Sequence, residues 1–196
     1  MSLLDRIIHF DYWLFFKVNG TWTNNFFDTV FPLVRESVIW IPLYLFLLVF
    51  ILTNFGSQGI YWAVALICTA SVCDIFSSHL IKEIIFRLRP CRNPEVEDHV
   101  RFLVIYCPRS SSFISSHATT HFGIAMFLYK TLRRYAPYWM GLFFVWAAMI
   151  AYAQVYVGVH FPIDIICGAL VGCLLGSAIS LLFNKYIQLI PHPSKT

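Results

Sequence analysis

Five long runs of apolar residues, joined by polar connections, constrain the fold of this chain more than any other feature of its sequence. The runs cover Val38–Phe55, Ile60–Ile81, His117–Tyr129, Tyr138–Val159 and Ile163–Phe183. A helix needs about 20 mostly apolar residues to cross a bilayer. Only 12% of the residues are charged, whereas a soluble domain has about 25%. The sequence therefore predicts an all-α integral membrane protein, with a bundle of about five transmembrane helices.

The first 36 residues differ from these runs. In Ser2–Asn19 apolar residues recur mostly at spacings of three and four, and Phe26–Val34 is a second short amphipathic piece after the break at Gly20–Asn25. Such spacing is typical of amphipathic helices, and the charges between them argue against a cleavable signal peptide. We expect a single membrane domain over residues 1–196, with interfacial helices in 1–36, a helical bundle in 37–184 and a tail in 185–196.

The distribution of charge bears on partners and orientation. The net charge is +4 without a basic run, so we expect no nucleic-acid binding. With five spans, the Lys130–Arg134 turn and Lys185 lie on one face, which the positive-inside rule makes cytoplasmic. The connection between Lys82 and Arg109 holds more basic residues, but there they alternate with acids. We therefore expect the opposite face, which carries that connection, to be extracytoplasmic.

Three polar clusters mark the ends of the apolar runs. They are Lys82–Pro90, Ser115–His117 and the segment from His160 to Asp164. With five spans, all three fall on the same side of the membrane, however the helices pack. Because ionisable groups at membrane depth are costly and usually functional, their convergence indicates a site.

The first two clusters suit a phosphate. Lys82 and Arg89 are seven residues apart, about two helical turns, so one helix face can present both cations. An ammonium and a guanidinium together bind phosphate oxygens well. Ser115 and Ser116 precede an apolar run, and the free N–H groups at a helix start also attract anions.

The histidines supply reactive groups. His160 lies four residues before Asp164, a carboxylate that can orient the ring and stabilise its charge after reaction. His160 could then attack phosphorus, while His117 could protonate a leaving oxygen. No carboxylate cage for magnesium or thiolate cage for zinc is evident, so we expect no metal and no cofactor.

These motifs resemble the type 2 phosphatidic acid phosphatase superfamily of membrane lipid phosphatases. The family's first motif, Lys-x6-Arg-Pro, is complete at residues 82–90. The second, Pro-Ser-Gly-His, becomes Ile-Ser-Ser-His at residues 114–117. The third, Ser-Arg-x5-His-x3-Asp, becomes Ala-Gln-x5-His-x3-Asp at residues 153–164.

The resemblance implies an enzyme, a metal-independent phosphatase, with a role for each matching position. His160 would be the nucleophile that forms a phosphohistidine, Asp164 would orient it, and His117 would be the general acid that later activates water. The phosphate-binding residues would be Lys82, Arg89, Ser115, Ser116 through its backbone N–H, and Gln154 at the family's arginine position.

The resemblance also implies a substrate class and a location. The substrate would be a lipid phosphate or diphosphate, such as undecaprenyl diphosphate, phosphatidylglycerol phosphate, phosphatidic acid or lipid A. The protein would lie in the bacterial inner membrane with its site on the periplasmic face. The sequence does not choose among these lipids.

Gln154 leaves alternatives open, since the family's arginine would add a third cation to the site. Arg101 or Arg109, in the connection that also carries the first two motifs, could compensate for it. Alternatively, the chain could be a catalytically impaired relative that binds or moves phospholipid. A small transporter is less expected, because its site would lie near mid-membrane in repeated halves.

Cys91 and Cys107 both lie in the polar connection on the site's face. In an oxidising compartment they could form a disulfide that ties Pro90 to the approach to Ser115. Two free thiols are the alternative, and we favour the disulfide.

Overall fold

The computed structural model describes residues 2–190, and within them every regular element is helical. The α-helices are α1 (Leu3–Phe16), α2 (Asn25–Val34), α3 (Ile41–Ile75), α4 (Lys82–Ile84), α5 (Ser116–Leu132), α6 (Leu142–Tyr156) and α7 (Pro162–Tyr186). The π-helical turns Lys17–Thr21 and Phe76–Ile81 and the 3₁₀ turns Ser37–Trp40, Pro90–Arg92 and Glu97–His99 lie between them. This agrees with the all-α prediction.

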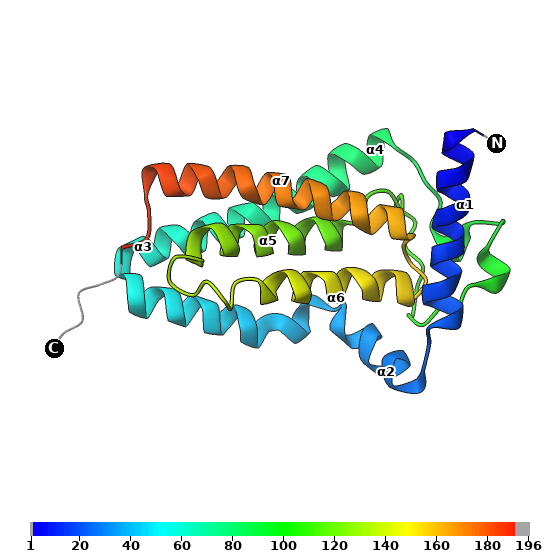
Figure 1. Cartoon of the computed structure of the whole chain (residues 1–196), viewed down its shortest axis with the longest axis horizontal. Coiled ribbons are helices and arrows are strands. Elements are labelled where there is room, and N and C mark those ends of the chain that lie inside the picture. Colours follow the sequence, from blue (N-terminus) through cyan, green and yellow to red (C-terminus); the bar gives the residue numbers. More distant parts are fainter. Residues whose placement is uncertain (1, 191–196) are drawn as a thin grey trace.

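Helix α3 is a hairpin of two antiparallel limbs (Figure 1). The chain turns at Gly56, whose φ of 53° and ψ of −127° are accessible mainly to glycine. The limbs approach closely beside this turn, because a Cβ on Gly59 would lie 2.6 Å from the carbonyl oxygen of Ile51. The break predicted between the first two apolar runs therefore lies at Gly56.

Two helical stretches are long and apolar enough to cross a membrane by length and composition. They are Ser37–Ile84, which contains both limbs of α3, and Pro162–Tyr186, which is α7. Helix α6 is equally apolar in character but shorter. The number of five crossings remains an expectation from the sequence.

Helix α5 is the centre of the bundle, where it contacts α7, α3 and α6 (Figure 1). The closest approach is to α7. A Cβ on Gly172 would clash with the carbonyl oxygen of Thr119, and one on Gly176 would clash with that of Gly123. Gly168, Gly172 and Gly176 recur at intervals of four along α7. These small residues allow the backbones of α5 and α7 to pack together, as such residues do in membrane helices.

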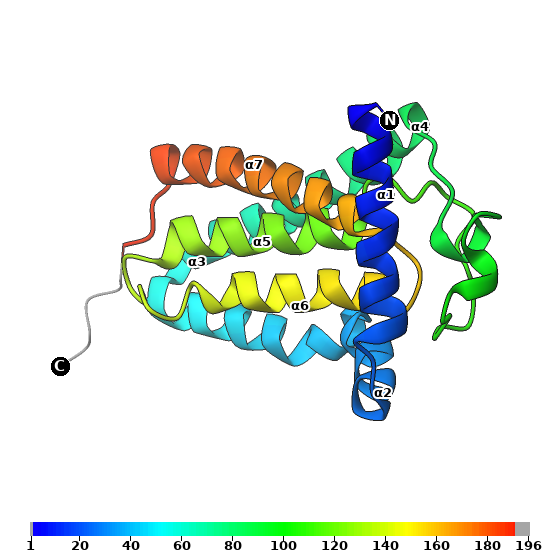
Figure 2. The same ribbon diagram turned by 45° about the vertical axis from the view of Figure 1, so that its right-hand side comes forward.

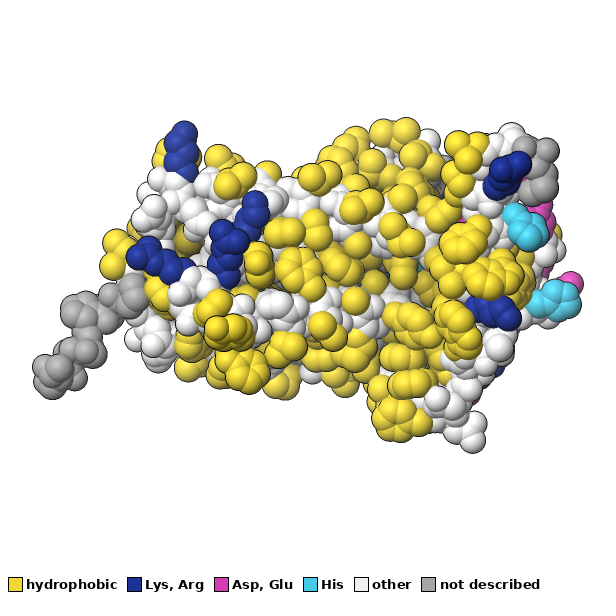
Figure 3. Space-filling view, viewed as in Figure 1, with side chains coloured by type: hydrophobic (Ala, Val, Ile, Leu, Met, Phe, Trp, Pro, Cys, Tyr) yellow, Lys and Arg dark blue, Asp and Glu magenta, His cyan; other side chains and the backbone are white. Residues whose placement is uncertain are grey.

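Helix α1 lies across one end of the bundle rather than along it (Figure 2). It is anchored there by Asp11 and Phe15, both fully buried, and the Phe15 ring packs edge-on against Phe161 at 5.2 Å. Figure 3 shows a broad apolar middle, with lysine and arginine at both ends and acids and histidines near α1. This distribution suits a bundle that spans a membrane with α1 near its surface.

Candidate active site

The three polar clusters meet at the α1 end of the bundle. The first follows the second limb of α3, the second begins α5, and the third forms the turn between α6 and α7 (Figure 1). The backbone N–H of Ser115 donates to the carbonyl oxygen of Asp164 at 3.1 Å, which joins the second cluster to the third.

A tight turn places His160. Helix α6 ends at Tyr156, and Gly158 takes a φ of 85°, a left-handed conformation that glycine adopts freely at helix ends. The N–H groups of Val159 and His160 then donate to the carbonyl oxygen of Gln154 at 3.1 and 3.3 Å. His160 is thereby fixed by backbone bonds, with only 2% of its surface exposed.

The two ring nitrogens of His160 face different groups. Nε2 lies 3.0 Å from Nη1 of Arg89. Because a guanidinium can only donate, Nε2 carries the lone pair and Nδ1 carries the proton. Nδ1 faces the Ser112 hydroxyl at 3.3 Å and Oδ2 of Asp164 at 3.6 Å. Burial lowers the pKa of His160 to about 4, although Asp164 opposes the shift, so the ring is neutral at pH 7.

Asp164 is fully buried in the first turn of α7. Three groups donate hydrogen bonds to its carboxylate, and one of them, Arg87, also donates to Asp11. Its Oδ2 accepts from the N–H of Phe161 at 2.8 Å and the hydroxyl of Ser112 at 2.5 Å. Its Oδ1 accepts from Arg87 Nη1 at 2.6 Å, and Arg87 Nη2 donates to Asp11 at 2.5 Å. A continuous chain of charged bonds therefore links α1 to the carboxylate beside His160.

Asp11, Arg87 and Ser112 are site residues that the sequence did not predict. Asp11 is one charge among several on an amphipathic helix, and Arg87 and Ser112 lie outside the three motifs. A signal was present at Arg87, since it stands between Lys82 and Arg89 in the same cationic cluster.

Arg89 is held in a single orientation by the backbone around it. Its guanidinium donates to the carbonyl oxygens of Ser110 at 3.0 Å, Val159 at 3.1 Å and Ser111 at 3.3 Å. Burial lowers its pKa to about 10, with Asp164 opposing and Arg35 adding to the shift. Arg89 therefore remains charged at pH 7 beside the lone pair of His160.

Lys82 joins the second cluster through Ser116, whose hydroxyl accepts from Nζ at 2.9 Å. Ser78, one turn earlier, lies 2.9 Å from the same hydroxyl. Ser115 instead caps α5, since its side chain accepts from the N–H of Ala118 at 3.4 Å. The two serines thus differ, with Ser116 facing the cation and Ser115 shaping the helix start.

His117 lines a cavity of about 400 Å³ together with Ser116, Asp74 and Ser37. A second cavity, of about 370 Å³, adjoins the first. The two share Ser37, Ala70, Thr120 and His121, and the second is otherwise lined mostly by apolar side chains such as Leu48, Trp62, Ala63, Leu66 and Ile124. A polar cavity at His117 therefore lies beside an apolar one between the limbs of α3 and helix α5.

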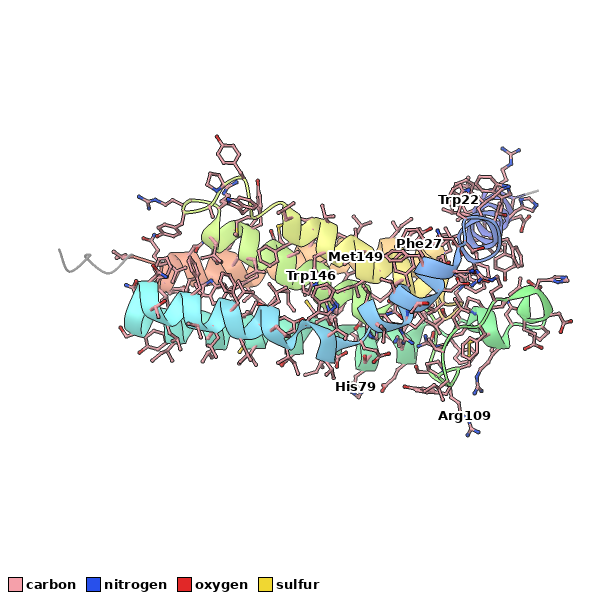
Figure 4. The ribbon with its side chains drawn as sticks, turned by 90° about the horizontal axis from the view of Figure 1, so that it is seen from below. Trp22, Phe27, His79, Arg109, Trp146 and Met149 are labelled. Atoms are coloured by element: carbon pink, nitrogen blue, oxygen red, sulfur yellow. A yellow bond between two sulfur atoms is a disulfide. The ribbon has the colours of Figure 1, made fainter. Side chains whose placement is uncertain are left out.

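Gln154, at the family's arginine position, and the two arginines considered as its replacement, Arg101 and Arg109, make none of the side-chain contacts described above. Gln154 is fully buried, and neither polar atom of its amide has a hydrogen-bond partner. Arg101 is bound by Asp28 at 2.6 Å and by the carbonyl oxygen of Asn19 at 3.1 Å. Arg109 is exposed and points outward from its loop (Figure 4). The structure therefore gives no support to the hypothesis that Arg101 or Arg109 compensates for Gln154, because Arg101 is paired with Asp28 and Arg109 faces away from the site.

Cys91 and Cys107 are joined in a disulfide, the pairing favoured from the sequence. It closes the loop that carries Arg89 at one end and leads to Ser110–Ser112 at the other. In the chain-entropy model a loop of this size stabilises the folded state by about 3 kcal/mol.

Comparison with known proteins identifies the family that this chain matches. A model described as the PAP2 superfamily matches residues 59–188. The chain is 28% identical to a lipid A 4′-phosphatase of Porphyromonas gingivalis, over 88% of this chain and 72% of that protein. It is 32% identical to a lipid A 4′-phosphatase of Bacteroides thetaiotaomicron, over 76% of this chain and 66% of that protein. It is also 32% identical to an undecaprenyl-diphosphatase of Sulfolobus acidocaldarius, over 75% and 63%.

Two solved structures have the same fold. Aquifex aeolicus LpxE matches with a TM-score of 0.63 at 26% identity, covering 86% of this chain and 93% of that one. A transmembrane PAP2-type phosphatidylglycerolphosphate phosphatase from Bacillus subtilis matches with a TM-score of 0.64 at 20% identity, covering 93% and 88%. Both agree with a helical membrane protein.

Proposed function

The chain belongs to the PAP2 superfamily, and we propose that it hydrolyses a lipid phosphate at the site built around His160. The observation that carries the proposal is the state of this ring. Its Nε2 lone pair lies 3.0 Å from the Arg89 guanidinium, while Nδ1 is directed to Ser112 and Asp164. A neutral histidine with a buried carboxylate behind it and a cation in front is suited to attack a phosphate.

In the first step, Nε2 of His160 attacks phosphorus and the bond from phosphorus to the lipid oxygen breaks. Arg89 and Lys82 neutralise the phosphate oxygens, and the N–H groups at the start of α5 add donors. His117 gives its proton to the departing lipid alkoxide. Asp164 stabilises the positive ring that results. The products are the lipid alcohol and a phosphohistidine.

In the second step, water attacks the phosphohistidine. His117, now without its proton, accepts a proton from this water. The bond between Nε2 and phosphorus breaks, inorganic phosphate leaves, and the lone pair returns to Nε2. Lys82 and Arg89 supply the positive charge in this scheme. We therefore propose a metal-independent reaction, as the resemblance to the family implies.

The adjoining apolar cavity favours a lipid over a soluble phosphate ester. It begins at Ala70 and His121, which it shares with the polar cavity at His117, so a headgroup and an acyl chain could occupy the two together. Because two of the named relatives are lipid A 4′-phosphatases, a lipid A phosphate is the first substrate to test. Undecaprenyl diphosphate, phosphatidylglycerol phosphate and phosphatidic acid follow.

We place the site on the periplasmic face of a bacterial inner membrane. The cationic turn at Lys130–Arg134 lies at the opposite end of the bundle from His160, in the connection between α5 and α6 (Figure 1). The positive-inside rule then supports a cytoplasmic position for that turn. The Cys91–Cys107 disulfide at the site's end also suits an oxidising compartment.

The test is phosphate release by the purified protein in detergent, with EDTA present, from a panel of these lipids. We expect release that His160→Ala abolishes and His99→Ala leaves unchanged, because His99 is exposed in the loop. Acid-labile phosphate should appear on wild-type protein and be missing from His160→Ala. Folded protein that releases phosphate from no lipid would overturn the proposal and favour a relative that only binds phospholipid.

A further inference from the structure

Arg35 is a mostly buried cation, and its neighbours do not satisfy all of its hydrogen-bond donors. Its side chain is 14% exposed, and its Nε is buried without a hydrogen-bond partner. The acid nearest to it is Glu36, whose side chain is 59% exposed and lies 3.7 Å from Nη1. Burying an N–H donor without a partner is unfavourable, and Nε of Arg35 is such a donor. This arrangement suggests an anionic partner.

The chain places Arg35 beside the cavity at His117. Arg35 caps the end of α2, and Ser37, two residues on, lines that cavity. The following Trp40 packs edge-on against Trp146 at 5.6 Å, and Trp146 packs edge-on against His121 at 4.9 Å. The connection between α2 and α3 is therefore held against the first turns of α5.

The position of Arg35 also relates it to two site residues that come from different elements. Its positive charge adds to the lowering of the Arg89 pKa. Ser37, two residues on, lines the same cavity as His117, where the leaving oxygen of the substrate must lie if His117 protonates it.

The site also needs another cation. Gln154 occupies the position where the family motif has arginine, and its amide carries no charge. Arg101 is paired with Asp28, and Arg109 points away. Arg35 comes from a part of the chain outside the family motifs. Its Nε is buried without a hydrogen-bond partner, and Ser37, two residues on, lines the cavity.

We propose that Arg35 supplies the third cationic contact to the substrate phosphate, replacing the charge that Gln154 lacks. The proposal rests on the proposed lipid phosphatase activity. The guanidinium of Arg35 binds a non-bridging phosphate oxygen and stabilises the charge that builds up as the bond to the lipid oxygen breaks. The connection between α2 and α3 is thus a wall of the phosphate pocket.

The test compares Arg35→Gln with wild type, using the lipid from which wild type releases phosphate best. Removing a charged contact made in the transition state typically lowers kcat by about 10²–10³-fold, and we expect a loss of this size. Inhibition by orthovanadate should weaken in parallel, since vanadate occupies the same pocket. Arg35→Lys should recover part of the activity because it restores the charge.

Two matched variants control for charge alone. Arg109→Gln removes an exposed arginine from the same end, and Glu36→Gln removes the acid nearest to Arg35. Both should keep wild-type rates and vanadate inhibition. If Arg35→Gln is folded and keeps both rate and vanadate inhibition, the proposal is wrong, although the phosphatase activity itself would stand.

A measurement on wild-type protein covers the case in which Arg35→Gln does not fold. Phenylglyoxal modifies arginine side chains, and peptide mass spectrometry locates the modification. Vanadate should protect Arg35 and leave Arg109 reactive. Equal modification of Arg35 with and without vanadate would overturn the proposal. A wild-type protein that releases no phosphate would instead count against the proposed function.

Discussion

At the scale of single residues, the protonation of His160 decides whether the site can react. Its ordinary pKa is about 6.5, and burial lowers the pKa to about 4. Between these values the unfolded chain binds a proton that the folded chain does not, so the free energy of unfolding falls as pH drops from 6.5 towards 4. Above pH 6.5 this contribution does not change.

We predict that His160 keeps a neutral ring, protonated on Nδ1, from pH 7.5 down to about pH 5. The measurement is nitrogen NMR of histidine-labelled protein in detergent, with the His160 signals assigned by their loss in His160→Gln. Exposed His9 serves as the assignment control, because its signals should remain in His160→Gln. Protonation of the His160 ring centred near pH 6.5, or a proton on Nε2 at neutral pH, would contradict the assignment of nucleophile and tautomer.

At the scale of elements, helix α1 is held at the site by Arg87, whose guanidinium forms ion pairs with Asp11 of α1 and with Asp164 of α7. Asp11 Oδ1 also accepts from the N–H of Ile163 at 2.8 Å, which docks α1 on the start of α7. Removing one member of a buried ion pair typically costs about 3–5 kcal/mol, and the surviving bond between Arg87 and Asp164 reduces that cost here.

We predict that Asp11→Asn lowers kcat about tenfold and lowers the melting temperature, with KM nearly unchanged. The reason is that Asp164 loses part of its support while Lys82 and Arg89 keep their contacts. Steady-state kinetics and thermal unfolding in detergent check this. Arg6→Gln, an exposed change on the same helix, should alter neither quantity. A raised KM with normal kcat would show that Asp11 acts on binding instead.

At the scale of the whole molecule, the polar cavity at His117 adjoins the apolar cavity between α3 and α5, with which it shares four lining residues. Ala63 lines the apolar cavity but not the polar one. We predict that Ala63→Phe lowers kcat/KM for the preferred lipid at least tenfold, because the larger side chain occupies the space of an acyl chain. Hydrolysis of a soluble ester such as p-nitrophenyl phosphate should change by less than about twofold.

The neighbouring Val64 provides a matched control for Ala63, since it is 53% exposed. Val64→Phe adds an aromatic ring on the outer surface of the same limb and should leave both substrates unaffected. Equal losses for lipid and soluble ester in Ala63→Phe would mean that the change disturbs the phosphate site. Unchanged lipid hydrolysis would mean that the acyl chain lies elsewhere.

The sequence by itself determined the class of the protein and the candidate reactive residues. Hydrophobic run length and helical periodicity are local properties, so the helical bundle and the turn near Gly56 could be read directly. The motif positions of Lys82, Arg89, His117 and His160 are also local. Because successive runs cross in alternate directions, a count of five runs places these residues at the same end of the bundle. The structure places all of them there.

Only the tertiary structure decided which other side chains complete the site. Asp11, Arg87 and Ser112 reach Asp164 because α1 and the loop after α4 dock at the end of the bundle, and no sequence spacing encodes that docking. Arg101 and Arg109 stood closer to the motifs in sequence, yet one pairs with Asp28 and the other is exposed. The physical reason is that burial and pairing depend on how distant segments pack, whereas hydrophobic pattern and motif spacing do not.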